Sequence, residues 1–283
     1  MELLVHGGAG RAPDEPEPRQ ATLEAAREAG LAAADPTAAV RAAIGHLEAD
    51  PRFNAGVGGA VQDDGVVRTD AGFMTDAGDC GAACGMPGVE HAVDVAHAVA
   101  METPHVLLAG DGAVEFAEGA GVASDRDLTT EATRARYDEA EPPGVDAGFD
   151  RRLAWVRDNF GGTDTVGAVA TDGDRLCAAT STAGRWFALA GRVGDVPQVG
   201  AGFYASEAAA ASATGEGEAI ARFGLARGVV EAVEAGADPG DAAADHLRQF
   251  EDRNGASAGV IVVDGDGRGG RASNAERMQT AGI

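Results

Sequence analysis

The chain has 283 residues and a formal net charge of −24, because 46 Asp and Glu residues stand against only 22 basic ones. Every basic residue is an Arg. The sequence therefore excludes functions that need a lysine, including Schiff-base chemistry, Ser–Lys dyads and Walker-type phosphate loops. A chain this acidic also does not bind nucleic acid or an anionic membrane through bulk charge.

The high negative charge also indicates the salt concentration at which the protein works. Self-repulsion at this charge needs screening, and molar salt shortens the Debye length to about 3 Å. We interpret the composition as an adaptation to a salt-rich cytoplasm, that is, as halophilic. The N-terminus lacks the features of a signal peptide and no long apolar run predicts a membrane span, so we expect a cytoplasmic protein.

The first half of the sequence predicts helices between short strands. Leu3 to Val5 is typical of a buried strand, and the glycines of 6–10 indicate a turn after it. Asp35 followed by Pro36 marks the start of a helix. We expect helices at 20–34, 37–49, 90–102, 111–119 and 129–139, paired short strands within 54–85, and a brief strand at 106–109.

Residues 139–164 interrupt this pattern. A Glu- and Pro-rich stretch is followed by one predicted helix at 150–160 and by two glycines, which is typical of a mobile linker. Hairpins with segregated helices come next and indicate an α+β fold built in layers. The predicted elements are strands at 165–170 and 175–182, two strands within 199–213, helices at 217–235 and 239–250, and a strand at 258–263.

Thr165 is the most informative residue, because it opens a buried strand directly after the linker. Cleavage of the Asp164–Thr165 bond would give Thr165 both a hydroxyl nucleophile and a free α-amine. Such an amine has a pKa near ~7.7–8.0, so it can act as the base for its own hydroxyl. The alternative from spacing alone is an ordinary β-branched residue at the start of a strand.

A series of ordered motifs adds to this interpretation. They are HGGAG at 6–10, FNAG at 53–56, DA at 70–71, TVGAVA at 165–170, TST at 180–182, GRVGD at 191–195, GAG at 200–202 and SATGEGE at 212–218, with Asn274 and Met278 near the C-terminus. In this order, and over nearly its whole length, the chain resembles the plant-type L-asparaginase/isoaspartyl peptidase family. The resemblance identifies Thr165 as the latent nucleophile.

The resemblance implies a single domain, 1–283, with the four-layer αββα sandwich of the N-terminal-nucleophile hydrolases. The precursor would cleave itself by an N→O acyl shift, giving chains 1–164 and 165–283, and two such units would pair as a homodimer. The mature enzyme would hydrolyse the side-chain amide of L-asparagine and of β-aspartyl dipeptides through an acyl-enzyme on Thr165. No cofactor would be required.

The resemblance also assigns roles around the nucleophile. Asn54 would hold the α-amine of Thr165, and Thr182 would tune its hydroxyl. Thr214 and the backbone N–H of Gly215 would form the oxyanion hole. A single donor of this kind is typically worth about 10²–10³ in rate.

A second group of residues would bind the substrate. Arg192 would clamp the α-carboxylate, because a guanidinium fork suits that geometry. Asp195 would pair with the substrate ammonium, and Gly184 and Gly217 would complete this part of the site. Without the resemblance, Arg192 and Asp195 would be interpreted as a surface ion pair worth about 0–1 kcal/mol.

The resemblance further suggests a structural sodium ion. Its ligands would be backbone carbonyls in the loop that contains Leu47, Glu48, Phe53, Ala55 and Val57. His91 and His97 lie six residues apart on one predicted helix, so they would not meet as metal ligands. The three cysteines, Cys80, Cys84 and Cys177, form no disulfide framework and are expected to be buried thiols.

The sequence departs from the family pattern at two places. Ala183 stands where the family usually has Gly, and its methyl could narrow the site or demand a changed backbone angle. Residues 185–190, RWFALA, are large and apolar where the family is commonly polar. If this stretch lines the entrance, it should favour bulkier or apolar leaving groups, and hence β-aspartyl peptides over free asparagine.

Three alternatives remain open at this point. A glycosylasparaginase of the same superfamily would cut a sugar–asparagine amide instead. An uncleaved, non-enzymatic relative would act as a binding or structural protein. A metal-dependent amidohydrolase would lose its activity to a chelator.

Overall fold

The computed structural model describes residues 1–144, 146–162 and 164–282, so positions 145 and 163 of the predicted linker lie outside the described residues. The strands are β1 (Glu2–Gly10), β2 (Arg68–Thr75), β3 (Cys80–Pro87), β4 (Leu107–Ala109), β5 (Val166–Thr171), β6 (Leu176–Thr182), β7 (Phe203–Ala205), β8 (Ala209–Gly215), β9 (Ala258–Asp264), β10 (Gly269–Ser273) and β11 (Arg277–Ala281). The helices are α1 (Pro16–Leu31), α2 (Pro36–Glu48), α3 (Ala92–Glu102), α4 (Gly110–Gly119), α5 (Glu131–Glu139), α6 (Phe149–Asn159), α7 (Gly217–Phe223), α8 (Leu225–Glu234) and α9 (Pro239–Asn254).

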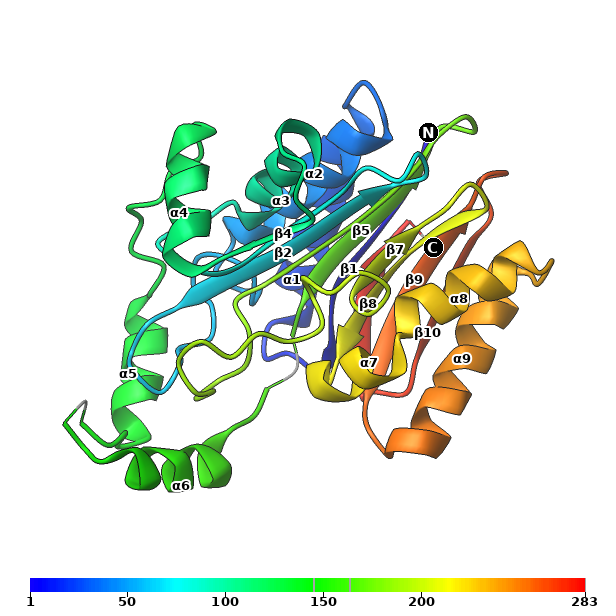
Figure 1. Cartoon of the computed structure of the whole chain (residues 1–283). Coiled ribbons are helices and arrows are strands. Elements are labelled where there is room, and N and C mark those ends of the chain that lie inside the picture. Colours follow the sequence, from blue (N-terminus) through cyan, green and yellow to red (C-terminus); the bar gives the residue numbers. More distant parts are fainter. Residues whose placement is uncertain (145, 163, 283) are drawn as a thin grey trace.

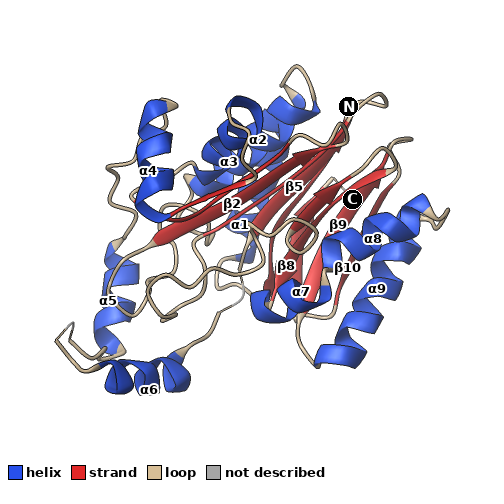
Figure 2. Cartoon of the chain, in the orientation of Figure 1, coloured by secondary structure: helices blue, strands red, loops and turns tan. Residues whose placement is uncertain are grey.

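The strands form two sheets that lie face to face. The larger sheet has the order β11-β1-β5-β6-β2-β3-β4 and the smaller one has the order β10-β9-β8-β7. Figure 2 shows helices on the outer side of each sheet, so that the layers run helix, sheet, sheet, helix. This arrangement confirms the predicted α+β sandwich of type αββα.

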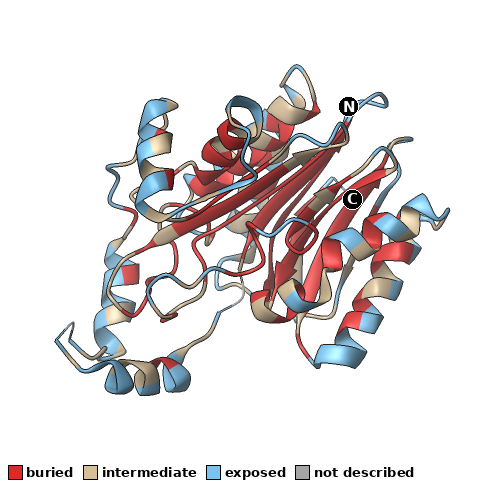
Figure 3. Cartoon of the chain, viewed as in Figure 1, coloured by how far each residue is buried: buried red, intermediate tan, exposed pale blue. Residues whose placement is uncertain are grey.

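Three apolar clusters hold the layers together. One lies between the larger sheet and helices α1 to α3, and another lies between the smaller sheet and α8 and α9. The third lies between the sheets and contains Leu4, Val169, Phe203 and Ile261. Figure 3 shows the central strands of both sheets as largely buried, whereas the edge strands β4 and β10 are mostly exposed. The sheets approach closely, because a Cβ on Gly72 would lie only 2.0 Å from the Phe203 ring.

The structure differs from the sequence prediction in three respects. β1 continues through 6–10, where a turn was expected, and an irregularity in its pairing between His6 and Ala9 accommodates the glycines. The helix expected at 217–235 is broken into α7 and α8, because Gly224 adopts a left-handed conformation with φ of 74°. Strands β10 and β11 were not predicted, since their sequences are polar and short.

Helices α5 and α6 stand apart from the sandwich. Figure 1 shows them at one end of the molecule, with the chain returning from α6 to the start of β5. The predicted helix at 150–160 is thus confirmed within one residue at each end. None of the helices in the described ranges is both long enough and apolar enough to cross a bilayer.

Candidate active site

Thr165 lies where the linker meets the centre of the larger sheet. It directly precedes β5, and only 6% of its surface is exposed. β5 pairs with β1 on one side and β6 on the other, with Val166 opposite Ser181 and Gly167 opposite His6. The backbone on both sides of Thr165 is therefore fixed by neighbours that are distant in the sequence.

The peptide bond before Thr165 is held by two side-chain donors. The carbonyl oxygen of Asp164 accepts a hydrogen bond from Asn54 Nδ2 at 2.8 Å and another from Thr182 Oγ1 at 3.1 Å. Asn54 Nδ2 also donates to the Gly184 carbonyl at 2.7 Å. We call Asn54, Thr182 and Gly184 the cradle. Three of the predicted site residues thus meet at the Asp164–Thr165 bond.

The carboxyl group of Asp164 lies in a poorly solvated position beside Gly8. A Cβ on Gly8 would come within 2.6 Å of Asp164 Oδ1. Burial raises the pKa of the Asp164 carboxyl, and the positive charge of Arg19 opposes that rise. Arg19 is itself anchored, because it donates to the Gly7 carbonyl and lies 4.5 Å from the centre of the Phe53 ring.

His6 supports the nucleophile strand from the β1 side. Its Nε2 lies 2.8 Å from Ser212 Oγ, which in turn lies 2.8 Å from Thr180 Oγ1. Burial lowers the pKa of His6 to about 3, although its contact with the Thr165 backbone acts in the opposite direction. The imidazole is therefore neutral near pH 7. These contacts indicate a structural role for His6, which links β1 to β8.

Thr214 and Gly215 end strand β8 near the end of β1. Thr214 Oγ1 accepts a hydrogen bond from the Ala9 N–H at 3.2 Å, which leaves its hydroxyl hydrogen available to a ligand. Gly215 has a φ of 138°, and a Cβ there would lie 2.4 Å from the Ser257 carbonyl oxygen. The fold therefore requires glycine at position 215, because any other side chain would clash with the Ser257 carbonyl. The backbone N–H of Gly215 lies in a conformation that other residues rarely adopt.

The predicted substrate residues form a cluster of charges. Arg192 pairs with Glu218, with Nε and Nη2 at 2.9 and 2.8 Å from Oε1. Arg185 pairs with the other oxygen of the same carboxylate, with Nη1 at 2.8 Å from Oε2. We call Arg185, Arg192, Asp195 and Glu218 the charged cluster. A Cβ on Gly217 would lie 2.6 Å from Asp195 and 2.8 Å from Arg192, so glycine keeps this space open.

Asp195 is the most deeply buried charge of this cluster. Its Oδ2 has no hydrogen-bond partner within the part of the chain that the structure describes. Burial raises the pKa of Asp195 to about 6, against the attraction of Arg192. Asp70 lies close enough to sense both groups. Burial raises its pKa to about 7, and the nearby Asp195 charge adds to this effect. A cationic ligand group beside Asp195 would favour its ionised form.

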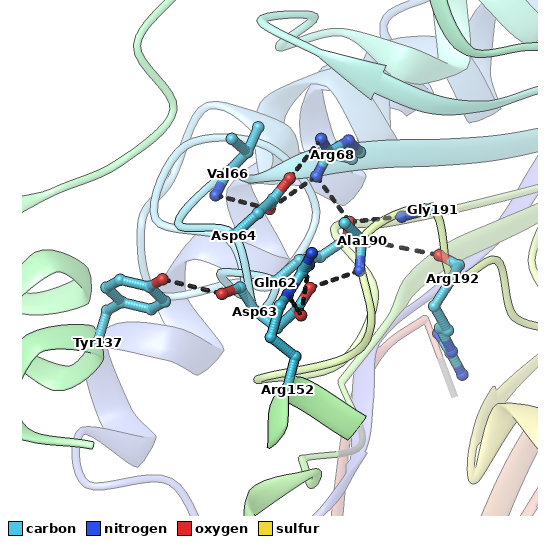
Figure 4. Close-up of polar contacts among 10 residues, drawn as sticks. All are labelled: Gln62, Asp63, Asp64, Val66, Arg68, Tyr137, Arg152, Ala190, Gly191 and Arg192. Atoms are coloured by element: carbon cyan, nitrogen blue, oxygen red, sulfur yellow. Dashed lines mark hydrogen bonds and ion pairs between the residues drawn. The ribbon is translucent and has the colours of Figure 1, made fainter. Parts of the chain in front are cut away.

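A buried ion pair braces the loop that carries Arg192. Asp63, with 1% of its side chain exposed, accepts hydrogen bonds from Arg152 of α6 at 2.6 and 2.9 Å and from the Ala190 N–H at 2.7 Å. The Tyr137 hydroxyl of α5 donates to the Asp63 carbonyl. Figure 4 shows these groups converging from α5, α6 and the 188–192 loop. Helices α5 and α6 are therefore joined to the 188–192 loop, which carries Arg192.

Gln62 braces the same loop beside Asp63. Its Oε1 accepts from the Gly191 N–H at 3.0 Å and from Arg68 at 2.8 Å, and its Nε2 donates to the Arg192 carbonyl at 3.4 Å. Arg68 is held in turn by Asp64 (Figure 4). The backbone of Arg192 is thus fixed even though its side chain belongs to the charged cluster.

The structure resolves both departures from the family pattern. The Ala183 side chain is fully buried in a cluster with Val61, facing Gly59 rather than the cradle. The methyl group of Ala183 therefore does not narrow the site. The backbone φ of Ala183 is not positive, so an alanine fits at this position without strain. The rings of Trp186 and Phe187 pack against each other, and Phe187 also packs against Trp155 of α6. In the uncleaved chain these rings therefore pack against α6, and the preference for bulkier or apolar leaving groups stays a prediction.

The predicted sodium loop is closed by its own backbone hydrogen bonds. The Leu47 carbonyl accepts from the Asp50 N–H, and the Glu48 carbonyl accepts from the Val57 N–H. The Glu48 carboxylate is buried and accepts from Ser181 Oγ at 2.6 Å, beside Thr182. No three His, Cys, Asp or Glu side chains within 1–144, 146–162 and 164–282 could hold a metal together. The sodium ion and the homodimer stay predictions.

Sequence reasoning did not assign roles to Arg185, Glu218 or Asp63. Two of them lie inside stretches that the sequence had singled out, since Glu218 ends the SATGEGE motif and Arg185 opens the apolar departure. Asp63 lies within the stretch 54–85 that is expected to form paired short strands, and no local pattern signals its pairing with Arg152, 89 positions away.

The chain is similar to known proteins over almost its whole length. A family model described as "Asparaginase" matches residues 1–283. The chain is 38% identical to the plant-type L-asparaginase of Pyrococcus furiosus over 294 aligned positions, which cover 99% of this chain and 95% of that protein.

Eukaryotic relatives match as well. The chain is 36% identical to the isoaspartyl peptidase/L-asparaginase of Danio rerio, with 94% of this chain and 86% of that protein covered. It is also 36% identical to the probable isoaspartyl peptidase/L-asparaginase 2 of Arabidopsis thaliana, with 82% and 80% covered.

Proposed function

Because the chain belongs to the asparaginase family, whose model matches its whole length, we propose that it is a self-activating amidohydrolase. It hydrolyses the side-chain amide of L-asparagine and of β-aspartyl (isoaspartyl) peptides. Thr165 is the nucleophile, first on its own peptide bond and then on the substrate. The names of the similar proteins from Pyrococcus furiosus and Danio rerio support this pair of substrates.

One observation carries the proposal. The carbonyl of Asp164, directly before Thr165, accepts hydrogen bonds from both Asn54 and Thr182. Donors placed on a carbonyl oxygen stabilise the negative charge that develops when its carbon is attacked. An ordinary strand-opening Thr has no need of two side chains that polarise the peptide bond before it.

The activation step follows from this arrangement. Thr165 Oγ attacks the Asp164 carbonyl carbon, and the cradle donors stabilise the resulting oxyanion. The C–N bond then breaks, the acyl group remains on Oγ as an ester, and the hydroxyl proton ends on the new α-amine. Water hydrolyses the ester, which releases Asp164 as a C-terminal carboxylate and restores the hydroxyl of Thr165.

Turnover uses the same hydroxyl with the new amine as its base. The amine takes the proton of Thr165 Oγ as this atom attacks the substrate amide, and Thr214 and Gly215 donate to the oxyanion. Arg192 binds the substrate α-carboxylate and Asp195 its α-ammonium. Ammonia or an amino acid leaves, and water hydrolyses the aspartyl ester on Thr165 to release aspartate.

The experiment is an assay of purified protein in high salt. Ammonia release from L-asparagine and leucine release from β-aspartyl-leucine should both be observed. Thr165→Ala should abolish both, whereas Thr165→Ser should retain part of the activity because it keeps a hydroxyl nucleophile. Hydrolysis by Thr165→Ala at the wild-type rate would overturn the proposal. Activity confined to N-acetylglucosaminyl-asparagine would replace it with a glycosylasparaginase function.

A further inference from the structure

Arg185 occupies a position that the proposed function has not used. It directly follows Gly184 of the cradle, and 14% of its side chain is exposed. Nη1 pairs with Glu218, while Nε donates to the Gly162 carbonyl at 2.7 Å. The guanidinium carbon also lies 4.1 Å from the centre of the Phe160 ring. One edge of the guanidinium is thus covered by the residues just before the scissile bond.

The partners on that edge belong to the segment that self-cleavage leaves with a free end. After cleavage, Phe160 and Gly162 are tethered to the fold from one side only. Gly162 offers a neutral carbonyl, and hydrogen bonds from a guanidinium to a carboxylate are about twice as strong as neutral ones. An anion that enters this space can therefore displace the Gly162 carbonyl from Arg185.

The location of Arg185 determines which part of a substrate reaches it. Arg192 and Asp195, which both lie beside Gly217, take the amino-acid end of the aspartyl group. A substrate reaches Thr165 only by taking the place of the residues before it. The Phe160 ring centre lies 4.1 Å from the Arg185 guanidinium and 5.9 Å from that of Arg192, whereas the Gly162 carbonyl contacts Arg185. The group that replaces them at Arg185 is the one on the far side of the amide from Arg192, which is the leaving group.

On these grounds, and resting on the proposed function, we propose that Arg185 is a specificity-determining residue that binds a carboxylate of the leaving group. Its Nε edge, vacated by Gly162, binds this carboxylate, while Nη1 keeps its pair with Glu218. β-Aspartyl peptides with a free C-terminal carboxylate are therefore preferred over peptides whose C-terminus is an amide.

The test compares β-aspartyl-leucine with β-aspartyl-leucinamide on protein shown by intact mass to be cleaved. The two substrates differ only in the carboxylate, so the ratio of their kcat/KM values isolates its contribution. We expect the wild-type ratio to be about tenfold or more in favour of the acid, as one charge-assisted contact provides. Arg185→Gln should bring the ratio close to one, and Arg185→Lys should give an intermediate ratio, because it keeps the charge without the fork.

Arg248→Gln on α9 is the matched control, since it removes the same charge from an exposed surface pair and should keep the wild-type ratio. A wild-type ratio near one, or an unchanged ratio in Arg185→Gln, overturns the inference. If Arg185→Gln does not cleave itself, inhibition of wild-type asparagine hydrolysis decides instead: leucine should inhibit more strongly than leucinamide, and equal inhibition refutes the role of Arg185. Absence of hydrolysis of any aspartyl amide by the wild type would instead be a failure of the proposed function.

Discussion

The two halves of the site differ in how complete they are before cleavage. In the cradle, uncharged donors already contact their target, because Asn54 and Thr182 both hold the Asp164 carbonyl. In the charged cluster, the groups contact one another instead. Arg192 and Arg185 share Glu218, and Asp195 keeps an unpaired oxygen among the described residues.

Under the proposed function, this difference matches two tasks performed in sequence. The cradle is preorganised for a reaction within the chain, whose reacting atoms are covalently attached. The charged cluster awaits a ligand that brings its own carboxylate and ammonium, and until then Glu218 stands in for the carboxylate. Variants of the cradle should therefore impair self-cleavage first, whereas variants of the cluster should impair substrate hydrolysis.

The largest effect is expected in the cradle. Asn54→Asp keeps an acceptor for the Ala60 N–H but replaces the donor to the Asp164 carbonyl with a carboxylate. Self-cleavage should slow by at least about 10²–10³-fold, because an oxyanion donor is lost. The rate is measured as the appearance of the 165–283 chain by intact mass. Asn159→Asp, at an exposed position of α6, is the matched control and should cleave normally.

A smaller effect is expected at Arg192. Arg192→Gln should lower kcat/KM for asparagine roughly a hundredfold, since a charge-assisted contact to the α-carboxylate is lost. Self-cleavage should still occur, because Arg192 makes no contact with the cradle donors among the hydrogen bonds of the described chain. If Arg192→Gln slows self-cleavage as strongly as Asn54→Asp does, the distinction between the two regions is lost.

The cluster should also appear in the pH dependence of kcat/KM. The pKa of Asp195 is raised to about 6 by burial, so acidification through pH 6 neutralises the carboxylate that attracts the substrate ammonium. The α-amine of Thr165 is protonated below about pH 7.7. The logarithm of kcat/KM should fall with a slope of one below that pH and a slope of two below about pH 6. Asp195→Asn should keep a slope of one throughout, and an unchanged profile would contradict this assignment.

The smallest effect on catalysis is expected from the buried ion pair between Asp63 and Arg152. Arg152→Met leaves the Asp63 carboxylate buried without its cation, which should lower stability by about 1–3 kcal/mol and raise KM for asparagine a few-fold by loosening the 188–192 loop. Thermal unfolding and steady-state kinetics measure the two effects. Arg151→Met, one residue earlier on the exposed face of α6, should change neither. A wild-type KM in Arg152→Met would show that the Asp63–Arg152 ion pair does not position the 188–192 loop.

Much of the fold could be predicted from local patterns. Asp35 caps α2 through the Ala38 N–H as its position before Pro36 suggested, and the hairpin of β5 and β6 follows from the turn between two apolar runs. The failures are also local in origin. Gly224 lies within an apolar helical pattern, and this pattern did not reveal that its backbone is left-handed. Strands β10 and β11 carry too few apolar residues for an alternating pattern to be recognised.

The site could be predicted only in part. Thr165, Asn54 and Thr182 were found through the resemblance, and they do meet at the bond before Thr165. The partners of Arg192 and Asp63 could not be predicted, because Glu218 and Arg152 lie in distant segments that the fold alone brings together. Spacing along the chain carries no information about such contacts.

Intact mass is the most direct test of the central claim, that Thr165 is a self-released nucleophile. Wild-type protein and Thr165→Ala would be purified in molar salt, incubated side by side and sampled over time. The account predicts that the wild type separates into chains 1–164 and 165–283, while the variant stays whole. An unbroken chain in both samples after long incubation would contradict the account, and a non-enzymatic binding role would then become the leading hypothesis.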